Sequence, residues 1–310
     1  RLSILDLSSA GHQPMHSVSK NFVIVFNGEI YNHMFLRSEL DSINHRYWKG
    51  HSDTETLLAA IEEWGLDEAL KKAKGMFALA LWDKNNKNLS LACDRIGEKP
   101  VYYGWVNGQF VFASELKAIK KFPDFKNPID RNVLALFLRL NSIPAPHSIY
   151  QNIFKIKPGE IICLDAVSMN IKKQKFWSIE EVYKKSDKTQ SRFTPLQAIN
   201  KLESVLSGAV SSQMQSDVPL GAFLSGGIDS STIVALMQTN SNLKVNTFSI
   251  GFNAKGFDEA KHAGMVAKHL GTNHFEKYIT EGDALDVIPN LPDIYDEPFA
   301  DSSQIPTYLV

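Results

Sequence analysis

The residues whose types and spacing could do chemistry lie at 225–230, where the sequence is Ser-Gly-Gly-Ile-Asp-Ser. A short apolar run over 219–224 predicts a buried strand before them, and apolar side chains at helical spacing from Ile233 to Met237 predict a helix after them. Glycines at such a junction let the backbone approach a ligand, and the unpaired N–H groups at the start of a helix attract anions. The pattern therefore predicts a loop that binds a nucleotide phosphate.

Asp229 decides which kind of phosphate loop this is. The loop has neither the Lys of the G-x-x-x-x-G-K-[ST] pattern nor the spacing of G-x-G-x-x-G. A carboxylate beside a phosphate is repulsive unless a cation lies between them, so we expect Mg²⁺ bound by Asp229 and phosphate oxygens. The alternative is a plain strand-to-helix turn with serine caps, which the same residues would serve equally well.

The N-terminal half holds a second set of polar residues, at 1–4, 27–32, 52–55 and 94–103. Each group also has a purely structural explanation. Asn27-Gly28 is a common hairpin turn, and Asp53 is a good N-cap for the helix that follows it. Asp94, Arg95 and Lys99 together are typical of a solvated turn with an ion pair. Their order along the chain, upstream of the phosphate loop, is what favours a functional explanation.

Two kinds of framework are predicted to hold these residues. The N-terminal part is strand-rich, with strands at 22–26, 77–82, 89–93, 101–105, 109–113 and 159–164 and a helix over 54–64. The C-terminal part alternates, with helices at 195–214, 230–239 and 258–270 and strands at 219–224, 245–252 and 275–279. Polar residues at 184–194 predict a linker, so domains are expected at 1–183 and 195–310. The first is predicted to be α+β and layered, the second α/β with a parallel sheet.

Composition excludes several classes of protein. The chain has 310 residues, 33 basic and 34 acidic, and its net charge of −1 gives no basic field for nucleic acid. No apolar stretch approaches the roughly 20 residues that span a bilayer, and no signal peptide opens the sequence. Cys93 and Cys163 lie in strand-like runs, as buried thiols do in a reducing cytoplasm. We expect a cytoplasmic protein without nucleic-acid or membrane partners, and a homodimer is left open.

Taken in order, these motifs resemble one family closely: the glutamine-dependent asparagine synthetases and the related asparagine-synthase-type amidotransferases. Residues 296–303 match the same family. The resemblance implies an αββα sandwich of the N-terminal-nucleophile hydrolase type, followed by a truncated parallel-sheet ATP-pyrophosphatase domain. It also implies ATP and Mg²⁺ as cofactors, with glutamine and, as the favoured acceptor, aspartate as small-molecule substrates.

The resemblance assigns roles to individual residues. Glutamine would be bound by Arg1 together with the backbone of Leu2, Ser3, Ile4 and Leu5, and by Asn27, Gly28, Glu29 and Asp53. Among these, Asn27 and the Gly28 N–H would form the oxyanion hole, and the two carboxylates would hold the substrate ammonium. ATP would be bound by Leu224, Ser225, Gly226, Gly227, Asp229, Ser230, Ser231 and Ile250. Asp229 would also bind the metal.

One departure from the family concerns the nucleophile. The family uses an N-terminal Cys whose own α-amine acts as the base, but no Cys opens this chain, and neither Cys93 nor Cys163 has such an amine beside it. We expect the Cys to lie upstream of Arg1 and the chain to be a fragment cut at both ends. A non-Cys residue upstream would favour a different class of protein, a non-catalytic nucleotide-binding relative.

The resemblance implies that the whole protein hydrolyses glutamine and passes ammonia to the second domain. There, ATP would adenylate a carboxylate and ammonia would displace AMP, with pyrophosphate as the other product. Aspartate going to asparagine is the favoured reaction. A sugar carboxylate used in surface-polysaccharide synthesis is the alternative acceptor.

Overall fold

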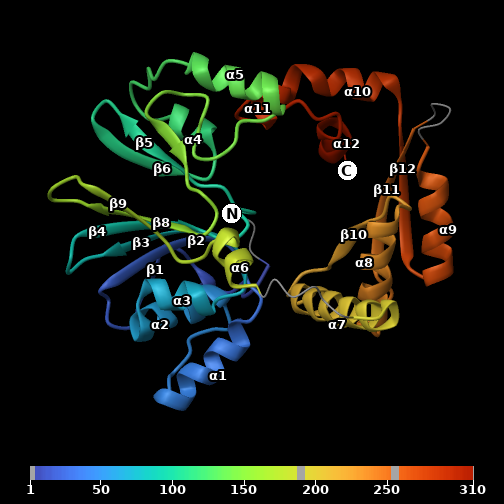
Figure 1. Cartoon of the computed structure of the whole chain (residues 1–310), viewed down its shortest axis with the longest axis horizontal. Coiled ribbons are helices and arrows are strands. Elements are labelled where there is room, and N and C mark those ends of the chain that lie inside the picture. Colours follow the sequence, from blue (N-terminus) through green and yellow to red (C-terminus); the bar gives the residue numbers. More distant parts are fainter. Residues whose placement is uncertain (1–3, 187–192, 253–257, 310) are drawn as a thin grey trace. The chain divides into compact units, whose positions relative to one another are not determined.

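The contacts within the chain divide it into two units in this computed structural model, which describes residues 4–186, 193–252 and 258–309 (Figure 1). Unit 1 consists of Arg1–Lys188 and Tyr295–Ala300, and unit 2 of Thr189–Ile294 and Asp301–Val310. The domain limits inferred from the sequence, 1–183 and 195–310, stay a prediction. They differ from the contact units chiefly at 295–300, which pack with unit 1.

Unit 1 is built around a six-stranded antiparallel sheet in the order β1-β2-β3-β4-β8-β9. Its strands are β1 (Met15–His16), β2 (Phe22–Ile30), β3 (Gly75–Asp83), β4 (Asn88–Cys93), β8 (Glu160–Asp165) and β9 (Ile171–Lys175). A second sheet has the order β6-β5-β7 and consists of β5 (Tyr102–Val106), β6 (Gln109–Ala113) and β7 (Ile153–Lys155). The strand predicted at 109–113 is confirmed, and the other predicted strands of this half differ at their ends by up to four residues.

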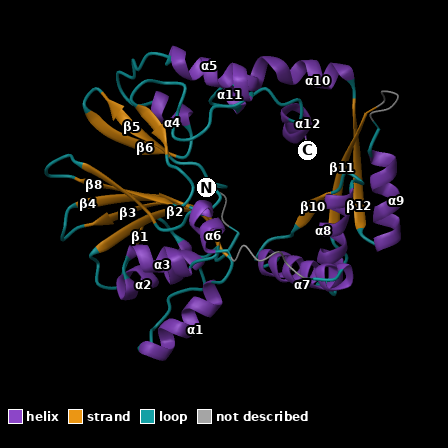
Figure 2. Cartoon of the chain, in the orientation of Figure 1, coloured by secondary structure: helices purple, strands orange, loops and turns teal. Residues whose placement is uncertain are grey.

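Helices cover both outer faces of these sheets (Figure 2). The helices of unit 1 are α1 (His33–Ile43), α2 (Asp53–Trp64), α3 (Leu66–Lys72), α4 (Leu116–Lys120), α5 (Arg131–Leu140) and α6 (Ile179–Lys185), with a short 3₁₀ helix η1 (Ser9–Gly11). One core joins the six-stranded sheet to α1, α2 and α3, and it includes Phe26 of β2 and Leu57 of α2. A second core fills the space between the sheets, and a third joins β5 and β7 to α4 and α5. The predicted αββα sandwich is confirmed.

The predicted turn at Asn27-Gly28 is wrong, because β2 runs straight through both residues to Ile30. Gly28 lies opposite Phe77 of β3 and has φ +155°. A Cβ on Gly28 would lie only 2.1 Å from the carbonyl oxygen of Met76. The glycine is therefore needed because two strands approach closely here, and it does not form a hairpin turn.

Unit 2 contains a three-stranded parallel sheet in the order β10-β11-β12, with β10 (Gly221–Phe223), β11 (Asn246–Phe252) and β12 (Asn273–Ile279). Its helices are α7 (Pro195–Gln213), α8 (Ile228–Thr239), α9 (Ala260–Leu270), α10 (Glu281–Val287), α11 (Leu291–Ile294) and α12 (Gln304–Leu309), with a 3₁₀ turn η2 (Ile288–Asn290). Leu224 and Val234 pack against Ala263 and Ala267 of α9 in its largest core. Strand and helix alternate along the chain, so the predicted α/β parallel-sheet unit is confirmed.

The segment Tyr295–Ala300 is anchored in unit 1 through the side chain of Glu297, which is 9% exposed. One carboxylate oxygen accepts a hydrogen bond from the backbone N–H of Ile149, at 2.8 Å. The other accepts from the Tyr102 hydroxyl at 3.2 Å and forms an ion pair with Lys155. A buried carboxylate needs this many partners to offset its lost hydration.

Candidate active site

The exposed edge of β2 presents three backbone N–H groups in a row. Phe26 donates to Oε1 of Gln13 at 2.7 Å, and Ile30 donates to Oδ2 of Asp53 at 2.8 Å. Alternate residues of a strand direct their N–H groups to the same edge. The N–H of Gly28, midway between these two, therefore points away from β3, to the edge where Gln13 and Asp53 lie.

A cavity of about 1390 Å³ opens beside this part of β2. It brings together three of the residues predicted to bind glutamine: Ile4, Asn27 and Gly28. Other parts of unit 1 complete its wall, and the lining residues include Asp6, Gln13, Met76, Glu98, Lys99 and Ser114. A backbone N–H and a side-chain amide, adjacent on one strand at the wall of a cavity, are the donors that an oxyanion hole requires.

Two buried carboxylates lie close to this wall. Glu29 follows Gly28 on β2, and both it and Asp53 are 3% exposed. Burial and the negative charge of Asp53 raise the pKa of Glu29, Lys99 lowers it, and the result is a pKa of about 7. Within the described residues, Oε1 of Glu29 has no hydrogen-bond partner. A buried, unpartnered carboxylate oxygen next to a second carboxylate favours binding of a cationic group.

Asp53 is not the helix cap that its position in the sequence favours. Ser52 is the N-cap of α2, and its hydroxyl accepts a hydrogen bond from the N–H of Glu55 at 3.2 Å. Asp53 is the first residue of the helix. Its carboxylate does not cap the helix and instead accepts a hydrogen bond from the N–H of Ile30 on β2.

The remaining predicted glutamine-binding residues differ in outcome. Arg1, Leu2 and Ser3 lie outside the described residues. Leu5 is buried, at 8% exposure, and is not among the residues that line the cavity. Its predicted role was carried by its backbone, so this burial leaves that prediction untested.

The loop after β4 supplies cavity residues that sequence analysis missed. Asp94 was expected in a solvated turn with an ion pair, but it is only 1% exposed. Its carboxylate accepts backbone N–H groups from the loop and from β3: Ile96 at 3.0 Å, Gly97 at 2.7 Å, Glu98, Lys99 and Phe77, each at 3.1 Å. Asp94 thereby fixes the loop that carries Glu98 and Lys99 to the cavity. Gly97 has a positive φ, +79°, which favours glycine. This glycine is the one sign in the sequence that the loop makes a tight turn here.

The environment of Cys93 does not suit a nucleophile. Both are free thiols, and Cys93 is buried. Burial and the nearby charge of Asp94 together raise the pKa of Cys93 to about 12. At neutral pH this side chain is therefore a thiol, whereas the thiolate is the reactive form.

The predicted phosphate loop of unit 2 lies between the end of β10 and the start of α8. Its serine hydroxyls bond within the loop: Oγ of Ser225 lies 2.9 Å from Oγ of Ser230 and accepts from the N–H of Gly227 at 3.3 Å. Gly226 has φ +78°, and a Cβ there would lie 2.7 Å from the backbone nitrogen of Ala263. The close packing of α9 is therefore enough to require this glycine, whether or not a phosphate is bound.

A cavity of about 320 Å³ begins at the same loop. Leu224, Ser225 and Ile250, all predicted to bind ATP, line it together with Phe248, Phe252, Glu259 and Thr307. It lies at the carboxyl ends of β10 and β11, which is where open parallel sheets bind ligands. Ser231 follows the loop on α8, and its hydroxyl is buried without a partner among the described residues.

The residues around Asp229 can accommodate a magnesium ion shared with phosphate. Asp229 is exposed in the first turn of α8. Across the described parts of the chain, no group of three or more His, Cys, Asp or Glu side chains could hold a metal by itself. Mg²⁺ bound with a nucleotide commonly takes one or two carboxylates and completes its shell with phosphate oxygens and water. A single carboxylate in the predicted phosphate loop agrees with that donor set.

Comparison with known proteins identifies a family for each half of the chain. A family model described as glutamine amidotransferase domain matches residues 1–177, and one described as asparagine synthase matches residues 201–310. A relative from Methanocaldococcus jannaschii is 37% identical over 327 residues, which cover 100% of this chain and 61% of the relative. Asparagine synthetase [glutamine-hydrolyzing] 1 of Bacillus subtilis is 34% identical over 315 residues, which cover 100% of this chain and 47% of that protein.

The chain therefore spans between about half and three fifths of the length of these relatives. Among solved structures, a glutamine phosphoribosylpyrophosphate amidotransferase of B. subtilis is 13% identical, with 92% of this chain and 76% of that chain covered. Its TM-score of 0.41 is too low to add to the fold assignment. In the described part of the chain, no helix has the length and apolar character to cross a bilayer. With a glutamine amidotransferase domain followed by an asparagine synthase domain, the chain belongs to the family of glutamine-hydrolysing asparagine synthetases and asparagine-synthase-type amidotransferases.

Proposed function

We propose that the complete protein is a carbon–nitrogen ligase that takes nitrogen from glutamine and uses ATP to amidate a carboxylate. One observation carries the proposal: Asn27 and Gly28 line a cavity at the open edge of β2, and the next residue is the buried Glu29, whose Oε1 accepts no hydrogen bond from any described residue. These are donors for an oxyanion and an acceptor for an ammonium, side by side. Glutamine carries both an amide carbonyl and an α-ammonium.

In unit 1, the proposed chemistry is acyl transfer from glutamine. The Asn27 amide and the Gly28 N–H would donate to the oxygen of the tetrahedral intermediate, where negative charge develops. Glu29 and Asp53 would oppose the α-ammonium of the substrate, and Arg1 its α-carboxylate. The nucleophile expected from the family is an N-terminal Cys, and Cys93, which is buried and has a raised pKa, does not fit that role.

In unit 2, the loop at 225–231 would hold the pyrophosphate part of ATP, and Leu224 and Ile250 would contact the adenosine. Asp229 would hold Mg²⁺, which when bound neutralises phosphate charge. The exposed start of α8 supports this proposal, since its N–H groups and serine hydroxyls can donate to phosphate oxygens. The products would be AMP, pyrophosphate and an amide.

Aspartate is the acceptor we propose, with asparagine as product, and the names of the relatives support it. A sugar carboxylate and a nucleotide-binding protein without catalysis are the other candidates weighed from the sequence, and no observation here favours either. The proposal places the protein in the cytoplasm, where its free thiols would stay reduced.

The test uses the complete protein with Mg-ATP, aspartate or a sugar carboxylate, and either glutamine or ammonia. We expect AMP and pyrophosphate release that depends on aspartate with both nitrogen donors, and asparagine identified by mass spectrometry. Release that depends only on the sugar carboxylate would replace aspartate as the acceptor. Nucleotide binding without pyrophosphate release under any of these conditions would overturn the proposed catalysis.

A further inference from the structure

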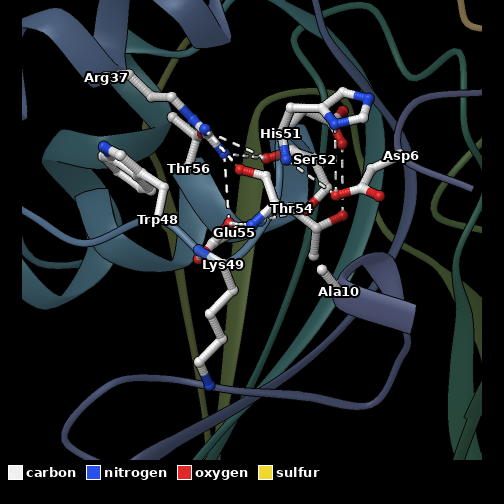
Figure 3. Close-up of polar contacts among 12 residues, drawn as sticks. Asp6, Ala10, Arg37, Trp48, Lys49, His51, Ser52, Thr54, Glu55 and Thr56 are labelled. Atoms are coloured by element: carbon white, nitrogen blue, oxygen red, sulfur yellow. Dashed lines mark hydrogen bonds and ion pairs between the residues drawn. The ribbon is translucent and has the colours of Figure 1, made fainter. Parts of the chain in front are cut away.

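Arg37 of α1 is a buried arginine that binds the backbone of residues 49–52, the segment leading into α2 (Figure 3). Its Nε donates to Oγ1 of Thr56 at 2.7 Å. Its two terminal nitrogens donate to the carbonyl oxygens of Gly50, at 2.8 Å, and Ser52, at 3.1 Å. One guanidinium therefore ties helix α1 to two peptide groups of the segment 49–52 and to the first turns of α2.

Glu55 of α2 binds both Arg37 and the same segment. Its carboxylate forms an ion pair with Arg37 at 3.4 Å and accepts the backbone N–H groups of Lys49, at 2.8 Å, and Gly50, at 3.1 Å. The ring of Trp48 lies over the guanidinium, with its centroid 4.3 Å from Cζ of Arg37. Stacking on an aromatic face and donation in several fixed directions are properties of arginine that lysine lacks.

Asp6 contacts the same segment independently of Arg37 (Figure 3). Its Oδ2 accepts the N–H of His51 at 2.9 Å. A Cβ on Gly50 would lie 2.0 Å from this same oxygen and 2.8 Å from Cβ of Ala10. The segment is therefore held by its backbone through both Arg37 and Asp6, with room for only a glycine at position 50.

The next residue after this segment is Asp53, whose carboxylate reaches Ile30 of β2 beside Glu29. Arg37 itself does not line the cavity beside β2. We propose that Arg37 is a positioning residue for glutamine binding: by fixing residues 49–52 it sets where the Asp53 carboxylate lies relative to Glu29. This inference rests on the proposed function of unit 1, and it adds to that function a residue with no substrate contact.

The test is Arg37→Lys in the complete protein, which keeps the charge but loses the fork of donors. We expect the KM for glutamine to rise on the order of tenfold, as for loss of one good charge-assisted contact, while kcat changes by less than about threefold. Ammonia-dependent synthesis should be unchanged. Glu55→Gln should also raise the KM for glutamine, but by less. The amide oxygen of the new side chain can still accept a hydrogen bond from the backbone of residues 49–52.

A pH profile separates positioning from simple destabilisation. In the described part of the chain, Asp53 and Lys99 are the charged groups that act on Glu29 from outside β2. If Asp53 moves away in Arg37→Lys, the pKa of Glu29 falls, and the ionisation limb in kcat/KM for glutamine moves to lower pH. A purely structural role would lower the melting temperature and leave that limb in place.

Arg46→Lys is the matched control, because Arg46 pairs with Glu63 near the other end of α2. It should leave both the KM for glutamine and the pH limb unchanged. A folded Arg37→Lys protein with the parent KM and the parent limb would overturn the inference and leave the proposed function standing. Absence of glutamine hydrolysis in the unsubstituted complete protein would instead end both.

Discussion

The Asp53 carboxylate accepts a hydrogen bond of 2.8 Å from the backbone N–H of Ile30, the residue that follows Glu29. This bond brings α2 to the edge of β2 and places two carboxylates in one buried region. Burial and the charge of Asp53 raise the pKa of Glu29 from 4.5 to about 7. The unliganded protein therefore keeps at neutral pH a carboxylate that is only partly ionised, and a bound cation would complete its ionisation.

Glu29→Gln should stabilise the unliganded protein at high pH. Because the pKa of Glu29 in the folded protein is raised, the folded state binds the proton more tightly, and stability falls as pH rises from 4.5 to about 7. Glutamine cannot ionise, so the variant escapes this loss. One pKa unit corresponds to about 1.4 kcal/mol, so the gain above pH 7 is up to ~3 kcal/mol. Denaturant unfolding of parent and variant at pH 5 and pH 8 measures it.

Glu62→Gln is the control, and its effect on stability at high pH should be opposite to that of Glu29→Gln. Burial of Glu62 is outweighed by hydrogen bonds from Ser19 and Ser17, and its pKa is lowered. Its stabilising contribution is therefore present above its ordinary pKa and is lost as pH falls, so the substitution should destabilise the protein at pH 8. A Glu29→Gln variant that is less stable than the parent at pH 8 would show that Glu29 is ionised and well satisfied without ligand.

Gly28→Ala should disrupt the pairing of β2 with β3. The added Cβ would lie 2.1 Å from the Met76 carbonyl oxygen and 2.5 Å from Cα of Phe77, and both are backbone atoms that cannot rotate away. We expect a loss of about 2–4 kcal/mol in the free energy of unfolding. Gly108→Ala is the matched control, because Gly108 also has positive φ, +73°, but has no atom within 4 Å of its added Cβ.

The control should cost only the conformational strain, about 1 kcal/mol. Equal losses in the two variants, measured by denaturant unfolding, would mean that β2 and β3 can separate cheaply at Gly28. In that case the oxyanion-hole geometry proposed for this strand would lack a rigid support.

The sequence predicted the layers of this fold better than the contacts of its candidate site. Hydrophobic periodicity identified strands such as Gln109–Ala113, because strand alternation is a local property. It gave no sign that β2 continues through Asn27-Gly28, since the cause is the backbone of β3 close to Gly28. A dipeptide with strong local turn preference was overridden by pairing with residues far along the chain.

Arg37 and Asp94 show the same limit at the level of side chains. Asp94 was expected in a solvated turn and Arg37 was not singled out, yet both are buried and bind backbone groups. Asp94 accepts an N–H from Phe77, and Arg37 donates to carbonyls of the segment 49–52. These partners are distant in sequence, so no spacing rule predicts them. Motif resemblance singled out Asn27, Gly28 and the loop at 225–230 as candidates, whereas only the folded chain identifies the residues that hold them in place.

Asp229→Asn should separate the two half-reactions of the complete protein. The substitution removes the carboxylate proposed to bind Mg²⁺ but keeps the length of the side chain and a hydrogen-bonding group. Mg-ATP-dependent pyrophosphate release should fall on the order of 10²-fold or more with either nitrogen donor, as for loss of a metal ligand. Glutamine hydrolysis measured without ATP should stay near the parent rate.

Asp286→Asn is the control, because Asp286 is an exposed aspartate on α10, and it should leave both rates unchanged. Unaltered pyrophosphate release in Asp229→Asn would contradict the metal-binding role.

Asn27→Ala tests the oxyanion hole itself. Asn27 lines the cavity beside β2, and its amide is proposed to donate only while glutamine is hydrolysed. Loss of one oxyanion donor lowers kcat by about 10²–10³, so glutamine-dependent synthesis by the complete protein should fall by that factor. Ammonia supplied directly bypasses the step, and ammonia-dependent synthesis should remain near the parent rate. Product formation with each donor, measured beside a thermal melt, gives the answer. If Asn27 is only a structural residue of β2, both activities and the melting temperature should fall together.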